Sequence, residues 1–214
     1  MTAKLQKFLA LLGAVATSAV VAGCGGEFVR DGKSPARLVI VALQGASGAQ
    51  PSEIGTTTHS DVLTLVTTGG VCTTDNPCPT IFSDVGQVEM RVLLRDIGSP
   101  TSPTSPSALN AITISRYHVK YVRSDGRNTQ GTDVPHEFDG AVTFTVPSDG
   151  SATAGFTLVR SQAKREAPLA PLVNNDTIIS TIAYVTFYGM DQAGNEVSIT
   201  GSIDVTFGNF GDPA

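Results

Sequence analysis

Tryptophan is absent from the 214-residue sequence, and cysteine and charge are both scarce: there are 3 cysteines, and 15% of the residues are charged. Without tryptophan, a carbohydrate-binding platform is disfavoured, because sugar-stacking sites favour large aromatic rings. Lysine and arginine number 14 against 19 acidic residues, which leaves a net charge of −5. The cations do not cluster along the chain, so this acidic protein is not expected to bind nucleic acid.

Catalytic signatures are also missing. The sequence contains no Gly-x-Ser-x-Gly, no His-Glu-x-x-His and no phosphate-binding glycine loop with its lysine. His59, Ser60 and Asp61 are merely consecutive, whereas a catalytic triad is defined by the spatial roles of its members. We therefore expect a protein that is not an enzyme, and an unrecognised hydrolase is the remaining catalytic alternative.

The N-terminal segment has the composition of a secretory signal. Lys4 and Lys7 precede an apolar run from Phe8 to Val21, and small residues come after the run. The run falls short of the ~20 apolar residues of a membrane span and is interrupted by glycine and hydroxyl side chains. Residues 1–23 are therefore predicted to form a cleaved signal helix.

Residues Val21-Ala22-Gly23-Cys24 resemble the lipobox of bacterial lipoproteins. In that family the cysteine is acylated with palmitate-like chains, the signal is removed before it, and a residue other than Asp at the next position favours the outer membrane. Here the next residue is Gly25. The resemblance implies a covalent lipid on Cys24 and a location on the cell envelope. Residues 24–35 mix glycine with charged residues and are expected to form a flexible tether. Two or more acyl chains anchor a protein stably, whereas one chain binds only weakly. Simple secretion and an uncleaved anchor are the alternatives.

Two further cysteines, Cys72 and Cys78, flank a turn-forming Asp75-Asn76-Pro77. Outside the cytoplasm such a pair normally oxidises, so we predict a disulfide that closes a short loop. A metal site would need further ligands nearby, and a redox pair is more often spaced Cys-x-x-Cys.

Strand-like patterns dominate the remainder. Residues 36–43 are apolar on both faces, which predicts a strand that is buried on both sides or central in a sheet. Residues 85–95 alternate, with Val88, Met90 and Val92 on one face. In residues 111–123 two isoleucines are out of phase with the tyrosines, which predicts a bulge near Ser115.

The C-terminal part predicts the clearest unit, a hairpin of residues 177–190 and 196–207 closed by Asp191-Gln192-Ala193-Gly194-Asn195. A last hairpin that carries Asp-x-Ala-Gly-Asn resembles bacterial extracellular immunoglobulin-like domains. Together with the other strands, it predicts an all-β protein, an antiparallel immunoglobulin-like β-sandwich of about seven to eight strands.

Residues 36–214 are expected to form one domain. The segment 99–107 is rich in Ser, Thr and Pro and is expected to be a stiff surface loop, with an interdomain linker as the alternative. Glycosylation of this loop is neither required nor excluded.

One polar cluster stands out, formed by Asp133, His136, Glu137 and Asp139. These side chains could bind a divalent cation, although they lack the spacing of a calcium loop, and solvated loop residues explain them equally well. A second set, Arg116, His118, Lys120 and Arg123, predicts a mildly basic strand face.

The leading hypothesis is a lipid-anchored, non-enzymatic structural or protein-binding module of the envelope, with a protein partner there. The alternative is a periplasmic cation- or ligand-binding module that uses the 133–139 loop.

Overall fold

The computed structural model describes residues 33–211. Strands make up 54% of the structure and helices 7%, so the prediction of an all-β protein is confirmed. The predicted signal segment, Cys24 and nearly all of the predicted tether lie outside the described residues. Within residues 33–211, no helix is both long enough and apolar enough to cross a membrane.

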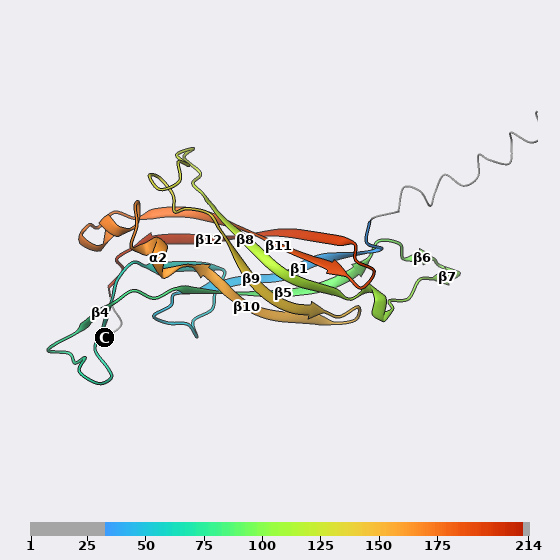
Figure 1. The fold of residues 1–214 in the computed structure, drawn as a ribbon, viewed down its shortest axis with the longest axis horizontal. Coiled ribbons are helices and arrows are strands. Elements are labelled where there is room, and N and C mark those ends of the chain that lie inside the picture. Colours follow the sequence, from blue (N-terminus) through green and yellow to red (C-terminus); the bar gives the residue numbers. More distant parts are fainter. Residues whose placement is uncertain (1–32, 212–214) are drawn as a thin grey trace, which may run out of the picture.

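Two sheets form the body of the molecule and lie as two layers (Figure 1). The smaller sheet has the order β1-β5-β10, from β1 (Ala36–Ala46), β5 (Asp84–Leu94) and β10 (Ser151–Val159). The larger sheet has the order β2-β12-β11-β8-β9. Its strands are β2 (Thr57–Asp61), β12 (Glu196–Gly208), β11 (Ile179–Asp191), β8 (Ile112–Val122) and β9 (Phe138–Val146). All neighbours in the two sheets are antiparallel except β2, which runs parallel to β12.

Two small hairpins project from opposite ends of the body (Figure 1). One pairs β3 (Thr64–Val66) with β4 (Cys78–Thr80), and the other pairs β6 (Gly98–Ser99) with β7 (Ser102–Pro103). The segment 99–107 belongs to the second hairpin and its continuation, and it is exposed throughout. Strand β5 precedes this segment and β10 follows it further along the chain, and the two strands pair in the same sheet.

Among residues 33–211, three short helices complete the fold: η2 (Ala108–Asn110), α2 (Ser161–Lys164) and η3 (Ala170–Asn174). The last two lie between β10 and β11, with α2 before Pro168 and η3 across Pro171.

The core between the sheets is built around an aromatic cluster. Tyr117 of β8 and Phe187 of β11 both contact Phe156 of β10, with ring centroids 5.2 Å and 5.4 Å from the Phe156 ring in edge-on geometry. Such edge-to-face arrangements are the favoured geometry for aromatic pairs. The Phe156 ring lies over Gly86 of β5, where a side chain would collide with it. The core therefore joins the two sheets through a ring that needs a bare backbone beneath it.

The predicted bulge in β8 is confirmed. In the pairing with β11, Arg116 and Ile114 lie opposite the adjacent residues Tyr188 and Gly189, so Ser115 is the extra residue. The pairing of β8 with β9 also shifts between Ile114 and Arg116. Ile112, Ile114 and Tyr117 are all buried as a result. The bulge thus brings the out-of-phase isoleucines and the tyrosines to the same core.

The prediction for residues 36–43 is wrong in its placement. These residues do form a strand, β1, but β1 lies at the edge of the smaller sheet, and β5 is the central strand. Val41 on its outer face is 51% exposed. An apolar run shows that a strand tolerates burial, but the number of neighbours is decided by the other strands of the sheet.

The C-terminal hairpin has its predicted alternation. Val197, Ile203, Val205 and Phe207 are buried, and Ser198, Thr200, Ser202 and Asp204 are exposed. Gly194 takes the positive φ of 87° that the turn needs. The Asp191 carboxylate accepts hydrogen bonds from the backbone N–H groups of Ala193 and Asn195 and from the Asn195 side chain, each at 2.9 Å. The predicted turn chemistry is confirmed.

Candidate functional site

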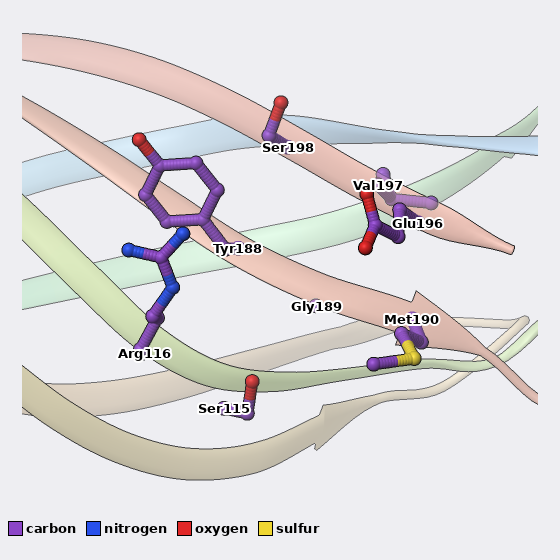
Figure 2. A pocket seen from close by; sticks show the side chains of 8 residues that line it. All are labelled: Ser115, Arg116, Tyr188, Gly189, Met190, Glu196, Val197 and Ser198. Carbon is purple, nitrogen blue, oxygen red and sulfur yellow. The ribbon is translucent and has the colours of Figure 1, made fainter. Parts of the chain in front are cut away.

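The bulge at Ser115 opens a hollow of about 420 Å³ on the outer face of the five-stranded sheet. It is lined by Ser115 and Arg116 of β8, by Tyr188, Gly189 and Met190 of β11, and by Glu196, Val197 and Ser198 of β12 (Figure 2). Gly189 forms part of the lining without a side chain, and a Cβ there would lie 2.3 Å from the Thr113 carbonyl oxygen. Because β8 and β11 approach closely at the bulge, a residue with a side chain does not fit at position 189.

Arg116 is held in place at one side of the hollow. Its guanidinium lies over the Tyr188 ring, 3.9 Å from the centroid, and Figure 2 shows the two side chains packed against each other. Its Nη1 also donates a hydrogen bond to the Asp139 carboxylate at 3.1 Å. The ion pair is exposed and contributes little to stability, but stacking on an aromatic face orders the guanidinium before any partner arrives.

Large side chains continue from the hollow along the outer face of β11, with Thr186 between Tyr188 and Tyr184. Met190 is 50% exposed and Tyr184 is 41% exposed, and Ile182 and Tyr188 are half-buried beside them. We call these four residues the β11 outer row. Because β11 is central in its sheet, the row crosses the middle of the face. Tyrosine, methionine and arginine are the residue types enriched in protein interfaces, so this face is the candidate binding surface.

The four residues of the predicted cation site do not come together. Asp133 accepts a hydrogen bond from the Thr129 backbone N–H at 3.1 Å, within its own loop. Glu137 and Asp139 instead face His118 of β8, with N–O distances of 3.7 Å and 3.3 Å. Residues 137 and 139 flank buried Phe138, so strand alternation turns both carboxylates outward towards β8. His136 lies beside Gly131.

Throughout residues 33–211, no group of three or more His, Cys, Asp or Glu side chains is arranged to hold a metal ion. The sequence interpretation placed the four residues together because they are close in the chain. In the fold they divide between a self-contained turn and a carboxylate pair that partners β8.

The same contacts place carboxylates beside the strand face that was predicted to be basic. Arg116 and His118 each have a β9 carboxylate beside them, and Arg123 forms an ion pair with Asp125, with Nη2 and Oδ2 2.6 Å apart. Arg123 and Arg127 donate hydrogen bonds to the Asp125 carboxylate, and these bonds lower the pKa of Asp125 well below its usual range. The surface predicted to be basic is thus a mixed-charge surface.

The predicted disulfide between Cys72 and Cys78 is confirmed. The two Cα atoms are 5.3 Å apart, and the bond closes a loop with a sequence separation of 6. Most of the enclosed residues are exposed. The bridge therefore stabilises a projecting hairpin and contributes no residue to the hollow.

One arrangement was not found from the sequence. Lys164 at the end of α2 and Asp84 at the start of β5 form a buried pair, with Nζ and Oδ1 2.7 Å apart and exposures of 1% and 0%. Nothing in the local pattern marks either residue, because Lys164 lies in a polar stretch and Asp84 precedes an alternating strand. Only the folding of α2 onto the sheet brings them together.

Comparison of the chain with protein-family models, with curated proteins and with solved structures finds no match. Its function is therefore inferred from the residues themselves.

Proposed function

We propose that this chain is a lipid-anchored envelope protein whose immunoglobulin-like β-sandwich acts as a non-enzymatic module that binds a protein partner. The observation that carries the binding role is the pre-ordered Arg116–Tyr188 stack beside the exposed Met190, on the outer face of the five-stranded sheet. The anchor rests on the lipobox-like residues that end at Cys24.

The strand order supports the immunoglobulin-like assignment. Across the smaller sheet, β1, β5 and β10 correspond to strands A, B and E of that fold. Across the larger sheet, β12, β11, β8 and β9 correspond to strands G, F, C and C′. The inter-sheet disulfide and the buried tryptophan of antibody domains have no counterparts among the described strands. The cluster around Tyr117 occupies the core in their place.

An anchor at Cys24 would orient the domain. The described chain starts beside the β6–β7 end of the body: Arg95 Nε donates to the Ser34 carbonyl oxygen at 3.1 Å, and the Arg95 backbone N–H donates to that of Pro35 at 2.9 Å. A tether from Cys24 would therefore meet the domain at this end. The β3–β4 hairpin with its disulfide would lie at the opposite, membrane-distal end (Figure 1).

A protein partner suits the face better than a small ligand does. The hollow is open and is continuous with the β11 outer row, whereas small-molecule sites are concave and enclose most of the ligand. Binding energy at protein interfaces concentrates in a few tyrosine, tryptophan and arginine side chains. Arg116, Tyr184 and Tyr188 supply such side chains, and the stack lowers the entropy lost when Arg116 is immobilised.

The binding role is tested by a photo-crosslinking residue in place of Met190 in the full-length protein in cells. A matched control carries the same residue in place of Thr153, which is exposed on β10 in the other sheet. We expect one crosslinked partner at position 190 and none at 153. Arg116→Ala should weaken that crosslink by about 5–30-fold, the factor that corresponds to 1–2 kcal/mol. The proposed surface is refuted if crosslinking is equally strong at positions 190 and 153, or if Arg116→Ala leaves the crosslink at position 190 unchanged.

The anchor is tested separately by metabolic labelling with an alkyne fatty acid and by membrane fractionation. Wild type should incorporate the label and sediment with the outer membrane, and Cys24→Ala should do neither. If the wild-type protein is not labelled, the proposed anchor is refuted. The crosslinking experiment still tests the proposed binding surface, because it does not depend on the anchor.

A further inference from the structure

We propose that Lys164 and Asp84 become joined by an amide bond between their side chains in the folded protein. Such a bond depends neither on the anchor nor on the partner. The proposal rests on the contact between the Lys164 amine and the Asp84 carboxyl group, whose Nζ and Oδ1 atoms are 2.7 Å apart. The two side chains are 1% and 0% exposed, and the residues are 80 positions apart in the sequence.

The surroundings hold the two groups in a fixed relation. Lys164 Nζ also donates a hydrogen bond to the Asp61 carbonyl oxygen at 2.8 Å, which fixes the end of the lysine side chain. The Gly48 backbone N–H donates to Asp84 Oδ1 at 2.9 Å. The approach of α2 is set by a further hydrogen bond, from the Ser161 backbone N–H to Ser83 Oγ at 2.9 Å.

The carboxyl group is unevenly satisfied. Oδ1 accepts from both Lys164 and Gly48, whereas Oδ2 is buried and, among the described residues, has no hydrogen bond of good geometry. The buried Ser60 hydroxyl interacts with the same carboxyl group and favours its charged form. A buried carboxylate normally has its oxygens paired, because an unpaired buried charge is costly. Oδ2 is therefore the oxygen whose removal costs the fold least.

Burial also favours the uncharged carboxyl group. Desolvation raises the pKa of Asp84, and this outweighs the opposing effect of the Lys164 charge and of the hydrogen bonds to the carboxyl group. A protonated acid can be attacked at its carbon, whereas a carboxylate resists attack. Water is excluded from both groups, which protects the product from hydrolysis.

The step is a condensation that needs no other reactant. One proton passes from the Lys164 ammonium to the Asp84 carboxylate, which leaves a neutral amine and a neutral acid. The Nζ lone pair then attacks Cγ, and the Nζ–Cγ bond forms as the Cγ–Oδ2 bond breaks. The departing oxygen keeps the transferred proton, takes a second proton from Nζ and leaves as water.

Two features of the site assist this reaction. The Gly48 N–H stabilises the negative charge that develops on Oδ1 during the attack, as a backbone donor does in an oxyanion hole. Holding the two groups together supplies an effective molarity of about 10⁵–10⁸ M in well-oriented cases, which replaces chemical activation of the acid. The resulting bond would tie α2 to β5 and close a long loop, constraining the unfolded chain as a disulfide does.

The chain's few lysines allow a direct test. The full protein is isolated from total cell extract, whether or not it is on a membrane, and is then denatured, reduced and digested with a lysine-specific protease. A free Lys164 is cleaved, so an unlinked chain yields separate fragments 34–120, 121–164 and 165–214. An amide-linked chain is not cleaved at Lys164. It yields fragment 34–120 joined to fragment 121–214, with a mass lower than the sum of the two by one water molecule.

Wild type should show the joined species and no fragment 165–214. Lys164→Arg removes the reactive amine, and it should release 34–120 and 121–214 as separate fragments. Glu89→Gln, on the same strand as Asp84, is a matched control that should keep the joined species. If wild type gives the three separate fragments, the pair is an ordinary buried ion pair and the proposal is refuted. That result comes from wild type alone and stands even if a variant fails to fold.

Discussion

The Gly86→Ala substitution probes the contact on which the core is centred. A Cβ at position 86 would lie 2.3 Å from Cζ of Phe156, well inside van der Waals contact. The φ angle of Gly86 is not positive, so alanine meets no backbone strain and the cost is steric. Phe156 is 8% exposed and is held by the Tyr117 and Phe187 rings, so its displacement must disturb both contacts.

The expected cost combines two effects. Forcing extra volume into a packed core costs about 1–3 kcal/mol, and each disturbed aromatic pair costs about 0.5–1.5 kcal/mol. With two such pairs disturbed, we expect Gly86→Ala to lower the free energy of unfolding by about 2–6 kcal/mol. With a urea m-value of about 2 kcal/mol/M, the unfolding midpoint should fall by at least roughly 1 M.

The assay is urea unfolding measured by circular dichroism. Gly155→Ala is the matched control, because it is exposed on neighbouring β10 and the nearest atom to its added Cβ, the Gly86 carbonyl oxygen, is 3.9 Å away. The change in its unfolding free energy should stay within about ±0.5 kcal/mol, as is typical of surface substitutions. If Gly86→Ala unfolds at the same urea concentration as Gly155→Ala, Phe156 does not lie over Gly86 and the core is packed differently.

Three other experiments test separate parts of the structure. Ile203→Asp puts a carboxylate in the core and should unfold the domain, whereas Ser202→Asp on the exposed face should be nearly neutral; matching thermal melts by circular dichroism would contradict the facing of β12. Tyr121→Phe removes the buried hydrogen bond to the Leu158 carbonyl oxygen, 2.6 Å long, and should cost about 1–3 kcal/mol in urea unfolding; no loss would mean that this hydroxyl is not buried. Burial raises the pKa of Asp191, but the hydrogen bonds of the turn outweigh it and lower the pKa, so the carboxylate stabilises the fold above pH 3.8 and this contribution is lost as the pH falls through the folded pKa. Asp191→Asn should accordingly destabilise the protein at pH 7, and its difference from wild type should shrink in acid; a difference that persists at low pH would argue against a charged Asp191.

Local pattern was enough for much of the fold. The alternation in β5 and β12 indicated the buried faces of both strands, because a strand with one wet face must change polarity at every residue. The slip at Ser115 was visible because the isoleucines and tyrosines of β8 lie in different phases, and a bulge is the means by which a strand changes phase. The same bulge shapes the candidate surface, although the sequence did not indicate a hollow there.

Contacts between segments that are distant in the sequence could not be predicted from the local sequence pattern. The cation-site prediction treated four polar residues as one group, but β8 draws Glu137 and Asp139 to His118. The apolar composition of β1 suggested a central strand, but within the described residues no strand lies on its outer side.

The amino-acid sequence by itself determined which residues face inward along β5 and β12, where the last hairpin turns and which cysteines pair, because these depend on neighbours a few positions apart. Only the tertiary structure decided which strand is central, that Tyr188 lies beneath Arg116, and that Lys164 and Asp84 meet as a buried pair. Those outcomes depend on the order in which strands far apart in the chain pair, and that order is set by the packing of the whole core.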